Sequence, residues 1–164
     1  MASGDTLCRF FPRNAERPAT NYPQNITRNG VEALAFDAAT DESCEFAGFM
    51  PRHYGGGGLT VTIGWMAATA TSGNCIWDLA MKSVSDDADD LDTKAFAAAN
   101  SVTDAAASAS GELSYATITF TDGADMDSIA AGEYFRMQLT RDADNGSDTM
   151  TGDAQLVFIE IRET

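Results

Sequence analysis

The stretch LTVTIGWMAATATSGNCIWDLAM, residues 59–81, carries the clearest secondary-structure pattern in the chain. Apolar side chains alternate with threonine or glycine over residues 59–65, and a second alternation follows over residues 75–82. A period of two is typical of a half-buried β-strand, because successive side chains point to opposite faces of a sheet. The linker ATATSGN, residues 68–74, suits the turn of a hairpin, so this stretch predicts two strands joined as a hairpin.

Shorter segments predict further strands on both sides of this stretch. Their apolar positions are Leu34 with Phe36, Cys44 with Phe46, Ala116 with Ile118 and Phe120, and Phe135 with Met137 and Leu139. Residues 156–161 are apolar in both phases, which fits a strand covered on both faces, deep in a sandwich or against another subunit. Residues 94–102 are predicted as a strand, although their alanines favour helix. Residues 122–133 predict a short helical turn that ends at Gly132.

Eight or nine short strands without a long helical period predict an all-β fold. We expect an antiparallel β-sandwich, a jelly roll of about eight strands. Trp65 and Trp77 fall in the apolar phase of their strands. They are therefore predicted to pack in the core and not to form a sugar-stacking platform.

The charge is unevenly distributed along the 164 residues, whose net charge is −15. Residues 1–30 carry four arginines against two acidic residues, a net charge of +2, whereas the other 134 residues carry 6 basic and 23 acidic groups, a net charge of −17. Residues 1–30 also hold three of the four prolines, which favour extended backbone. The sequence therefore predicts an extended basic N-terminal arm, residues 1–30, and a jelly-roll domain, residues 31–164.

The basic and aromatic residues of this arm are the predicted partner-binding residues: Arg9, Phe10, Phe11, Arg13, Arg17, Tyr22 and Arg28. The acidic excess of the whole chain repels polyanions, so we expect neither nucleic acid nor an anionic membrane as a partner. The opening MASGDTLCRF lacks a basic segment followed by an apolar one, so no secretory signal is expected. Three widely spaced cysteines predict free thiols, without a disulfide framework or a zinc site.

No motif predicts a catalytic residue. His53 is the single histidine and no G-x-S-x-G segment exists, so we expect His53 to be structural or solvent-facing. The glycines of residues 55–58 lack the lysine of a phosphate-binding loop. They predict a loop that lies close to another backbone.

Two acidic segments are candidate cation sites. In RDADNGSDTMTGD, residues 141–153, the candidate calcium ligands are Asp142, Asp144 and Asp148, because Ca²⁺ selects carboxylate and carbonyl oxygens. The segment lacks the terminal glutamate of an EF-hand, and a plain Asx-rich hairpin turn is the other interpretation. The aspartates of residues 86–92 are interpreted as a solvated acidic loop. No other cofactor is expected.

Several segments together show a resemblance to known reading frames. They are SGDTL at residues 3–7, FDAATDE at residues 36–42, residues 46–61, FTDGADMDSI at residues 120–129 and RDADNGSDTMTGDA at residues 141–154. The chain resembles, over most of its length, open reading frames among the structural genes of tailed bacteriophages. The resemblance implies a virion protein, and a jelly roll of this size is similar to capsid decoration, or cement, proteins. It implies no catalytic residue.

The leading hypothesis is a non-enzymatic capsid decoration protein. It is made in the host cytoplasm, forms a homotrimer on the outer capsid surface, and stabilises the major capsid protein shell through residues 1–30. The alternative is a receptor- or carbohydrate-binding jelly roll on a head fibre or tail, which needs an exposed aromatic groove with a residue such as Tyr54. An enzyme such as a calcium-dependent glycan hydrolase would need two opposed carboxylates in a cleft.

Overall fold

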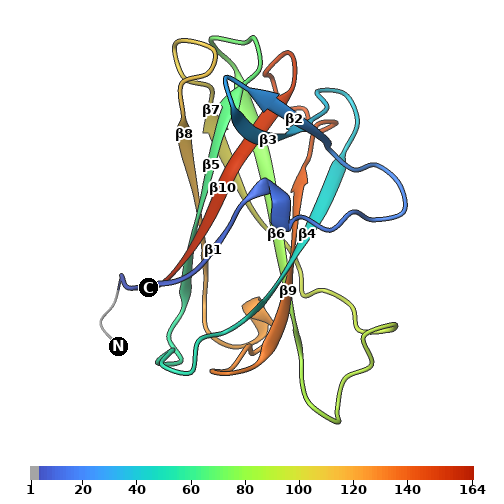
Figure 1. The fold of residues 1–164 in the computed structure, drawn as a ribbon, viewed down its shortest axis with the longest axis vertical. Coiled ribbons are helices and arrows are strands. Elements are labelled where there is room, and N and C mark those ends of the chain that lie inside the picture. Colours follow the sequence, from blue (N-terminus) through green and yellow to red (C-terminus); the bar gives the residue numbers. More distant parts are fainter. Residues whose placement is uncertain (1–3) are drawn as a thin grey trace.

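A computed structural model describes residues 4–164, and within them the chain forms ten strands in two antiparallel sheets. Sheet A has the order β2-β3-β10-β5-β8, with β1 also paired to β10, and sheet B has the order β4-β9-β6-β7 (Figure 1). The strands are β1 (Thr6–Phe10), β2 (Gln24–Arg28), β3 (Val31–Phe36), β4 (Glu42–Phe49), β5 (Leu59–Ala67), β6 (Asn74–Val84), β7 (Asn100–Ala105), β8 (Ser114–Phe120), β9 (Tyr134–Arg141) and β10 (Ala154–Glu163). The predicted all-β sandwich is confirmed, with ten strands in place of about eight.

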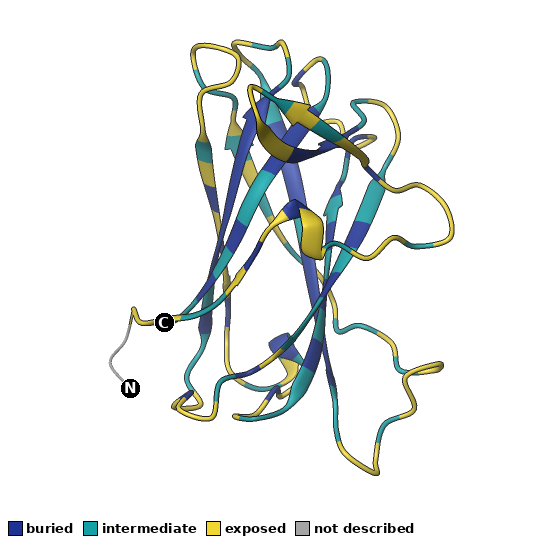
Figure 2. Ribbon diagram, viewed as in Figure 1, coloured by how far each residue is buried: buried dark blue, intermediate teal, exposed yellow. Residues whose placement is uncertain are grey.

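The core lies between the two sheets, and the buried positions follow the predicted alternation (Figure 2). In β9, for example, Phe135, Met137 and Leu139 are buried while the residues between them are partly exposed. Trp65 and Trp77 are fully buried, with ring centroids 6.0 Å apart. Their prediction as core residues is therefore correct.

The predicted hairpin of residues 59–81 does not form. β5 belongs to sheet A and β6 to sheet B, so the linker between them passes from one sheet to the other. The physical reason is that both strands bury one apolar face, and those faces pack against each other across the core, as the two tryptophans do. Alternation identifies the buried face of a strand but not its hydrogen-bonding neighbour.

Residues 4–30, predicted as part of an extended arm, lie on the sandwich. β1 pairs with β10, and β2 pairs with β3 through the turn at Asn29 and Gly30. The division after Gly30 thus falls inside a hairpin turn, where both residues have positive φ. The prolines lie in the connections, where Pro12 begins the short 3-10 helix η1 (Pro12–Asn14). Residues 1–3 of the predicted arm lie outside the described residues.

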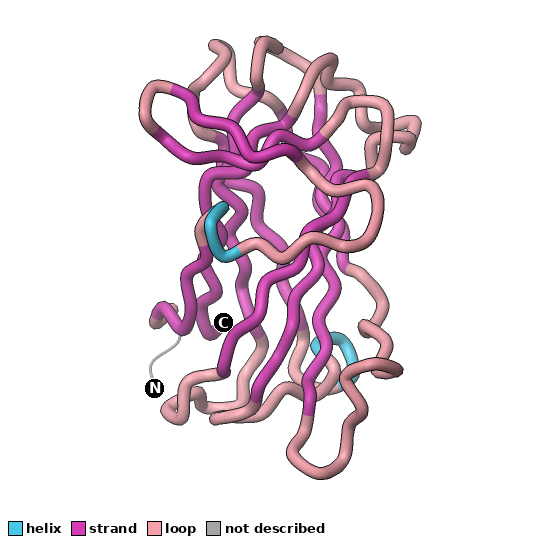
Figure 3. Tube along the Cα trace, turned by 45° about the vertical axis from the view of Figure 1, so that its right-hand side comes forward, coloured by secondary structure: helices cyan, strands magenta, loops and turns pink. Residues whose placement is uncertain are grey.

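Two smaller predictions have different outcomes. β7 begins at Asn100, so residues 94–99 are not a strand, and they run as a loop after β6. The helical turn within residues 122–133 is confirmed as the 3-10 helix η2 (Ala124–Met126), and Gly132 has a φ of +80°. Both 3-10 helices lie outside the sheets, and loops gather at the two ends of the sandwich (Figure 3). None of the described helices has the length or the apolar character needed to cross a membrane.

β10 explains why residues 156–161 are apolar in both phases. Its pairing with β5 shifts register between Leu156 and Phe158, which is a β-bulge. The bulge turns Leu156 and Ile159 into the core, whereas Val157 and Phe158 remain partly exposed. The apolar run therefore serves the core on one side and the outer face of sheet A on the other.

Candidate functional site

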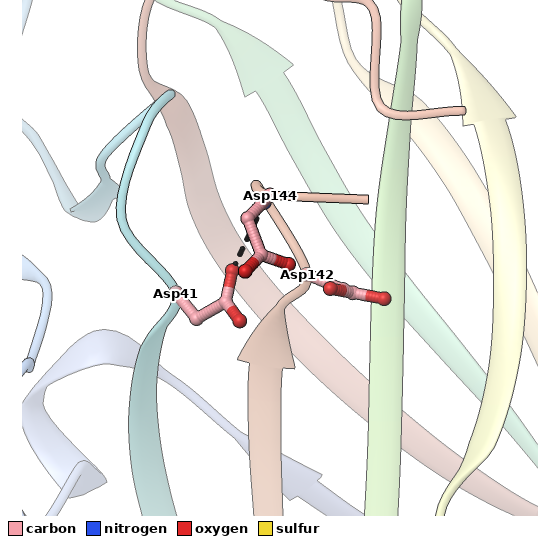
Figure 4. Close-up of side chains that lie close together, drawn as sticks. All are labelled: Asp41, Asp142 and Asp144. Atoms are coloured by element: carbon pink, nitrogen blue, oxygen red, sulfur yellow. Dashed lines mark hydrogen bonds between the residues drawn. The ribbon is translucent and has the colours of Figure 1, made fainter. Parts of the chain in front are cut away.

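Three aspartates come together where β9 ends and β4 begins. Asp41 precedes β4, while Asp142 and Asp144 follow β9, and the two strands are antiparallel neighbours. One carboxylate oxygen from each aspartate lies within 4.8 Å of the others (Figure 4). Carboxylates at this spacing are candidates to ligate one hard cation.

Local hydrogen bonds position these carboxylates. The backbone N–H of Asp144 donates to Asp41 Oδ1 at 3.1 Å, which joins the two loops. The side-chain amide of Asn145 donates to Asp142 Oδ2 at 2.8 Å. Asp37 accepts backbone hydrogen bonds from Ala39 and Thr40 in an Asx turn, which bends the chain before Asp41.

The carboxylates repel one another. The charge of Asp41, followed by desolvation and the charge of Asp142, raises the pKa of Asp144. In the neighbouring strand β6, burial raises the pKa of Asp78, and the charges of Asp142 and Asp41 raise it further. A cation bound among them would offset this repulsion. The donor set, carboxylate oxygen with neither sulfur nor imidazole, fits Ca²⁺.

Asp148, predicted as a third calcium ligand, instead forms an ion pair with Arg141. Its carboxylate accepts hydrogen bonds from Arg141 Nη2 at 2.9 Å and Nε at 3.0 Å, and both side chains are almost fully buried. The Ile76 N–H also donates to Asp148. The sequence prediction is wrong for this residue because spacing alone does not show that Arg141 points into the core. Asp41 takes its place in the cluster, although about 100 residues separate it from Asp142 in the chain.

Two predicted partner-binding residues are structural. Phe10 is buried and packs against Phe46 and Phe135, with ring centroids 5.7 and 6.2 Å away. The Arg28 guanidinium donates to the carbonyl of Ala67 at 3.0 Å, and it also donates to the Ala68 carbonyl and the Gln155 and Ser110 side chains. Both predictions fail because β1 and β2 are strands of sheet A, so a side chain at their ends can enter the core or connect two loops.

The other predicted partner-binding residues lie on the surface. The Arg9 and Arg13 side chains are 63% and 73% exposed, and they pair with Glu160 and Glu32. Phe11 is exposed beside Arg13. The Arg17 guanidinium lies 4.9 Å from the centroid of the exposed Tyr22 ring, a cation–π contact. These five residues do not form one cluster, since Tyr22 lies next to β4 of sheet B through the bond from Ser43 N–H to Asn21 O.

A recess of about 620 Å³ lies at the other end of sheet B. Phe49, which is 66% exposed, and Tyr134 line it, with ring centroids 5.4 Å apart. Carboxylates of the β6–β7 loop and Glu133 complete the wall, and no basic side chain is among its described lining residues. The sequence analysis missed Phe49, although it falls out of phase with the buried Cys44 and Phe46, which is a signal of an outward side chain.

The remaining candidates are structural. His53 is exposed in a turn, and no hydrogen bond joins its side chain to another described residue. Tyr54 is buried and its hydroxyl donates to the Gly57 carbonyl, so it is not a surface tyrosine. A Cβ atom on Gly58 would lie 2.5 Å from the Phe120 carbonyl oxygen, as expected of a close backbone approach. The Gly55 N–H binds the chain's own Glu163 carboxylate at 2.9 Å.

The three cysteines are free, as predicted, and none lies in the aspartate cluster. Burial raises the pKa of Cys8 to about 11, and burial raises the pKa of Cys44 and Cys75 further. Thiols held in the neutral form are neither nucleophiles nor metal ligands at neutral pH.

The fold is a jelly-roll β-sandwich, and the same fold occurs in solved structures of carbohydrate-binding modules. No protein-family model and no curated protein sequence matches the chain. The likeness is therefore one of fold, seen against solved structures that share little sequence with this chain.

Three of these structures illustrate the likeness. A carbohydrate-binding module, CBM36, in complex with calcium and xylotriose is 14% identical, with a TM-score of 0.56 over 94% of this chain and 99% of that one. CBM35 from Cellvibrio japonicus Abf62 is 12% identical, with a TM-score of 0.55 over 94% and 91%. The tandem CBM22-1–CBM22-2 of Paenibacillus barcinonensis Xyn10C is 13% identical, with a TM-score of 0.57 over 97% of this chain and 50% of that one.

Proposed function

We propose that the chain is a non-catalytic, calcium-dependent carbohydrate-binding β-sandwich. The observation that carries the proposal is the convergence of Asp41, Asp142 and Asp144 from two separate loops. Its context supports it, because the fold is shared with carbohydrate-binding modules, one of them in complex with calcium and xylotriose. The proposal keeps the carbohydrate binding of the alternative hypothesis, but its site is the aspartate cluster and not an exposed aromatic groove with Tyr54, which is buried.

The cluster supplies part of a calcium shell. Ca²⁺ takes about six to eight oxygen ligands, so three monodentate carboxylates would leave positions for other oxygens. Two neighbouring hydroxyl oxygens of a sugar could fill these positions as calcium ligands. The adjacent outer face of sheet B adds polar side chains that could orient the sugar. Ser43 and Thr140 share a hydrogen bond of 2.7 Å there, and Ser101 donates to Asp78.

The experiment measures calcium and glycan binding separately. Titration calorimetry with CaCl₂ is expected to show one site in the wild type and at least a tenfold weaker site in Asp144→Asn, an order-of-magnitude figure for the loss of one charged ligand. Asp87→Asn, an exposed aspartate in the β6–β7 loop, makes the same charge change away from the cluster and should bind calcium normally.

A glycan array with calcium, and with a chelator in its place, then tests the function. We expect binding that requires calcium and is lost in Asp144→Asn but not in Asp87→Asn. Calcium binding without any glycan binding would refute the carbohydrate function. Glycan binding that a chelator leaves unchanged would refute the role of the aspartate cluster.

The location on a virion, the homotrimer and the capsid partner stay predictions that rest on the sequence resemblance. Their direct test is binding of the full chain to purified phage heads. Deletion of residues 1–30 is unsuitable, because it would remove β1 and β2 from sheet A and Phe10 from the core. Charge reversal at the exposed Arg9 and Arg13 changes the same segment without removing a strand or a core residue.

A further inference from the structure

The outer face of sheet A carries a contiguous apolar surface, here called the sheet A patch. Its members come from β3, β8, β10 and the segments next to β1 and β8: Phe11, Val31, Leu113, Tyr115, Val157 and Phe158. Two hollows of about 520 and 380 Å³ meet on it, because both are lined by Val31 and Val157. Of the seven exposed large apolar or aromatic side chains among the described residues, four belong to this patch.

Specific backbone features build the patch. The β-bulge of β10 turns Val157 and Phe158 outward. The Phe158 ring covers Gly64 of β5 so closely that a Cβ atom on Gly64 would lie 2.1 Å from the ring. Tyr115 packs on the Phe158 ring with centroids 5.4 Å apart, yet Tyr115 remains 62% exposed. An aromatic ring over a strand glycine restores the packing that the glycine lacks, so the patch is an ordered surface.

Basic side chains surround the patch, although the chain as a whole is strongly acidic. Arg13 lines one hollow, and Arg9 and Arg162 lie along β1 and β10. Arg28 lines the other hollow, where its guanidinium is bound to groups of its own chain and contributes positive charge without a free donor face. Glu32 pairs with Arg13, and Glu160 pairs with Arg9 and with Arg162. The Arg13–Glu32 pair is exposed on both sides, and such a pair contributes little and can exchange partners. The surface therefore suits an apolar partner that carries negative charge.

The chain itself has an acidic surface with exposed apolar side chains, at the end of the sandwich where β6 ends. The β6–β7 loop runs over residues 85–99. Its first part, residues 85–93, here called the acidic loop, contains five aspartates, and the one basic residue of the loop, Lys94, follows directly. The acidic loop extends from the end of the sandwich opposite the β2–β3 hairpin (Figure 1). Leu91 in this loop is 48% exposed, and the exposed Phe49 lies in the recess beside it. Six of the seven exposed apolar side chains thus lie in two surfaces of opposite charge.

The acidic loop is held in place without using all its charges. Lys94 pairs with Asp89 and with Asp127 at 3.1 Å each, and Asp89 also accepts a hydrogen bond from Ser85 N–H. No ion pair joins Asp86, Asp87 or Asp92 to a described side chain. Asp92 directly follows Leu91, and Asp86 and Asp87 are exposed in the same loop, so all three remain available to a basic surface.

We propose that the acidic loop of one copy binds the sheet A patch of a second copy, head to tail. Leu91 enters the hollow beside Val31 and Val157, and the loop aspartates face the surrounding arginines. A symmetric contact between two sheet A patches would place arginines against arginines, and one between two acidic loops would place aspartates against aspartates. A head-to-tail contact leaves one free surface at each end, so copies can close into a ring such as a trimer.

Charge reversal in the full chain tests the proposal. Arg13→Glu and Asp92→Arg each place like charges together and are expected to weaken self-association about tenfold, whereas the double variant restores it by exchanging the two charges. Leu91→Ser, which removes the apolar anchor, is expected to weaken association as well. Arg17→Glu is the matched control, since it makes the same charge change beside Tyr22, away from the patch.

Multi-angle light scattering and sedimentation over a concentration series give the readout, with circular dichroism to confirm that each variant folds. A wild-type chain that is monomeric at every concentration would overturn the proposal. So would association that Leu91→Ser and Arg13→Glu leave unchanged, or a double variant no stronger than the single ones. A chelator should not alter association, so a failed calcium site and a failed head-to-tail contact are distinguishable.

Discussion

The buried ion pair between Arg141 and Asp148 is predicted to fix the loop after β9, and substitution of Asp148 tests this. Asp148→Ala removes a carboxylate that accepts hydrogen bonds from Arg141 Nε and Nη2 and from the Ile76 N–H. Arg141 is then left buried with its remaining donors fixed on the carbonyls of Phe36, Met150 and Gly152. Breaking a buried pair in this way costs about 3–5 kcal/mol.

The loss is measurable by thermal and denaturant unfolding. At about 2–4 °C per kcal/mol for a chain of this size, we expect the Tm to fall by about 6–20 °C. Asp148→Asn keeps an acceptor and should lose less. Ser147→Ala, exposed in the same loop, is the control and should stay within about 0.5 kcal/mol of the wild type. An Asp148→Ala variant within about 1 kcal/mol of the wild type would refute the reasoning.

Three further predictions concern the aspartate cluster, the thiols and sheet A. Neighbouring charges raise the pKa of Asp144, so its ionised form is disfavoured in the fold, and in the absence of calcium acidification through this pKa relieves the repulsion. Protonated Asp144 is a poorer calcium ligand, so calcium affinity is expected to fall over the same pH range. Calorimetry between about pH 7 and pH 4 checks this. Burial raises the pKa of Cys8 to about 11 and raises those of Cys44 and Cys75 further. A thiol reagent near pH 8 should therefore label the native chain slowly, and it should label all three thiols quickly after unfolding. Fast labelling of the native chain would contradict this. Gly64→Ala should cost about 1–3 kcal/mol by displacing Phe158, and Phe158→Ala should abolish most of that cost in the double variant.

Much of the fold could be predicted because it depends on local alternation. Each residue of β8 and β9 that alternation assigned to the core is buried, since a strand with one apolar face must cover that face. The N-terminal segment could not be placed in this way. Its prolines and arginines predict an extended backbone, and an extended segment can either project or pair with a sheet edge, as β1 does with β10.

The candidate site shows the same limit. The segment after β9 was recognised as rich in oxygen ligands, and two of its three predicted ligands, Asp142 and Asp144, lie in the cluster. Asp148 is not in the cluster, because it forms an ion pair with the buried Arg141. Asp41, which was not predicted, is in the cluster because β4 pairs with β9. Neither effect leaves a signal in the spacing of the residues themselves.

The sequence by itself determined the fold class, the buried face of most strands, the two core tryptophans and the strong acidity. These properties depend on side-chain period and composition, which are local or additive. Only the tertiary structure decided that β5 and β6 lie in different sheets, that the predicted arm is part of sheet A, and which aspartates meet. These features arise from contacts between residues far apart in the chain, where competing pairings satisfy the same local pattern and only packing of the whole core selects one.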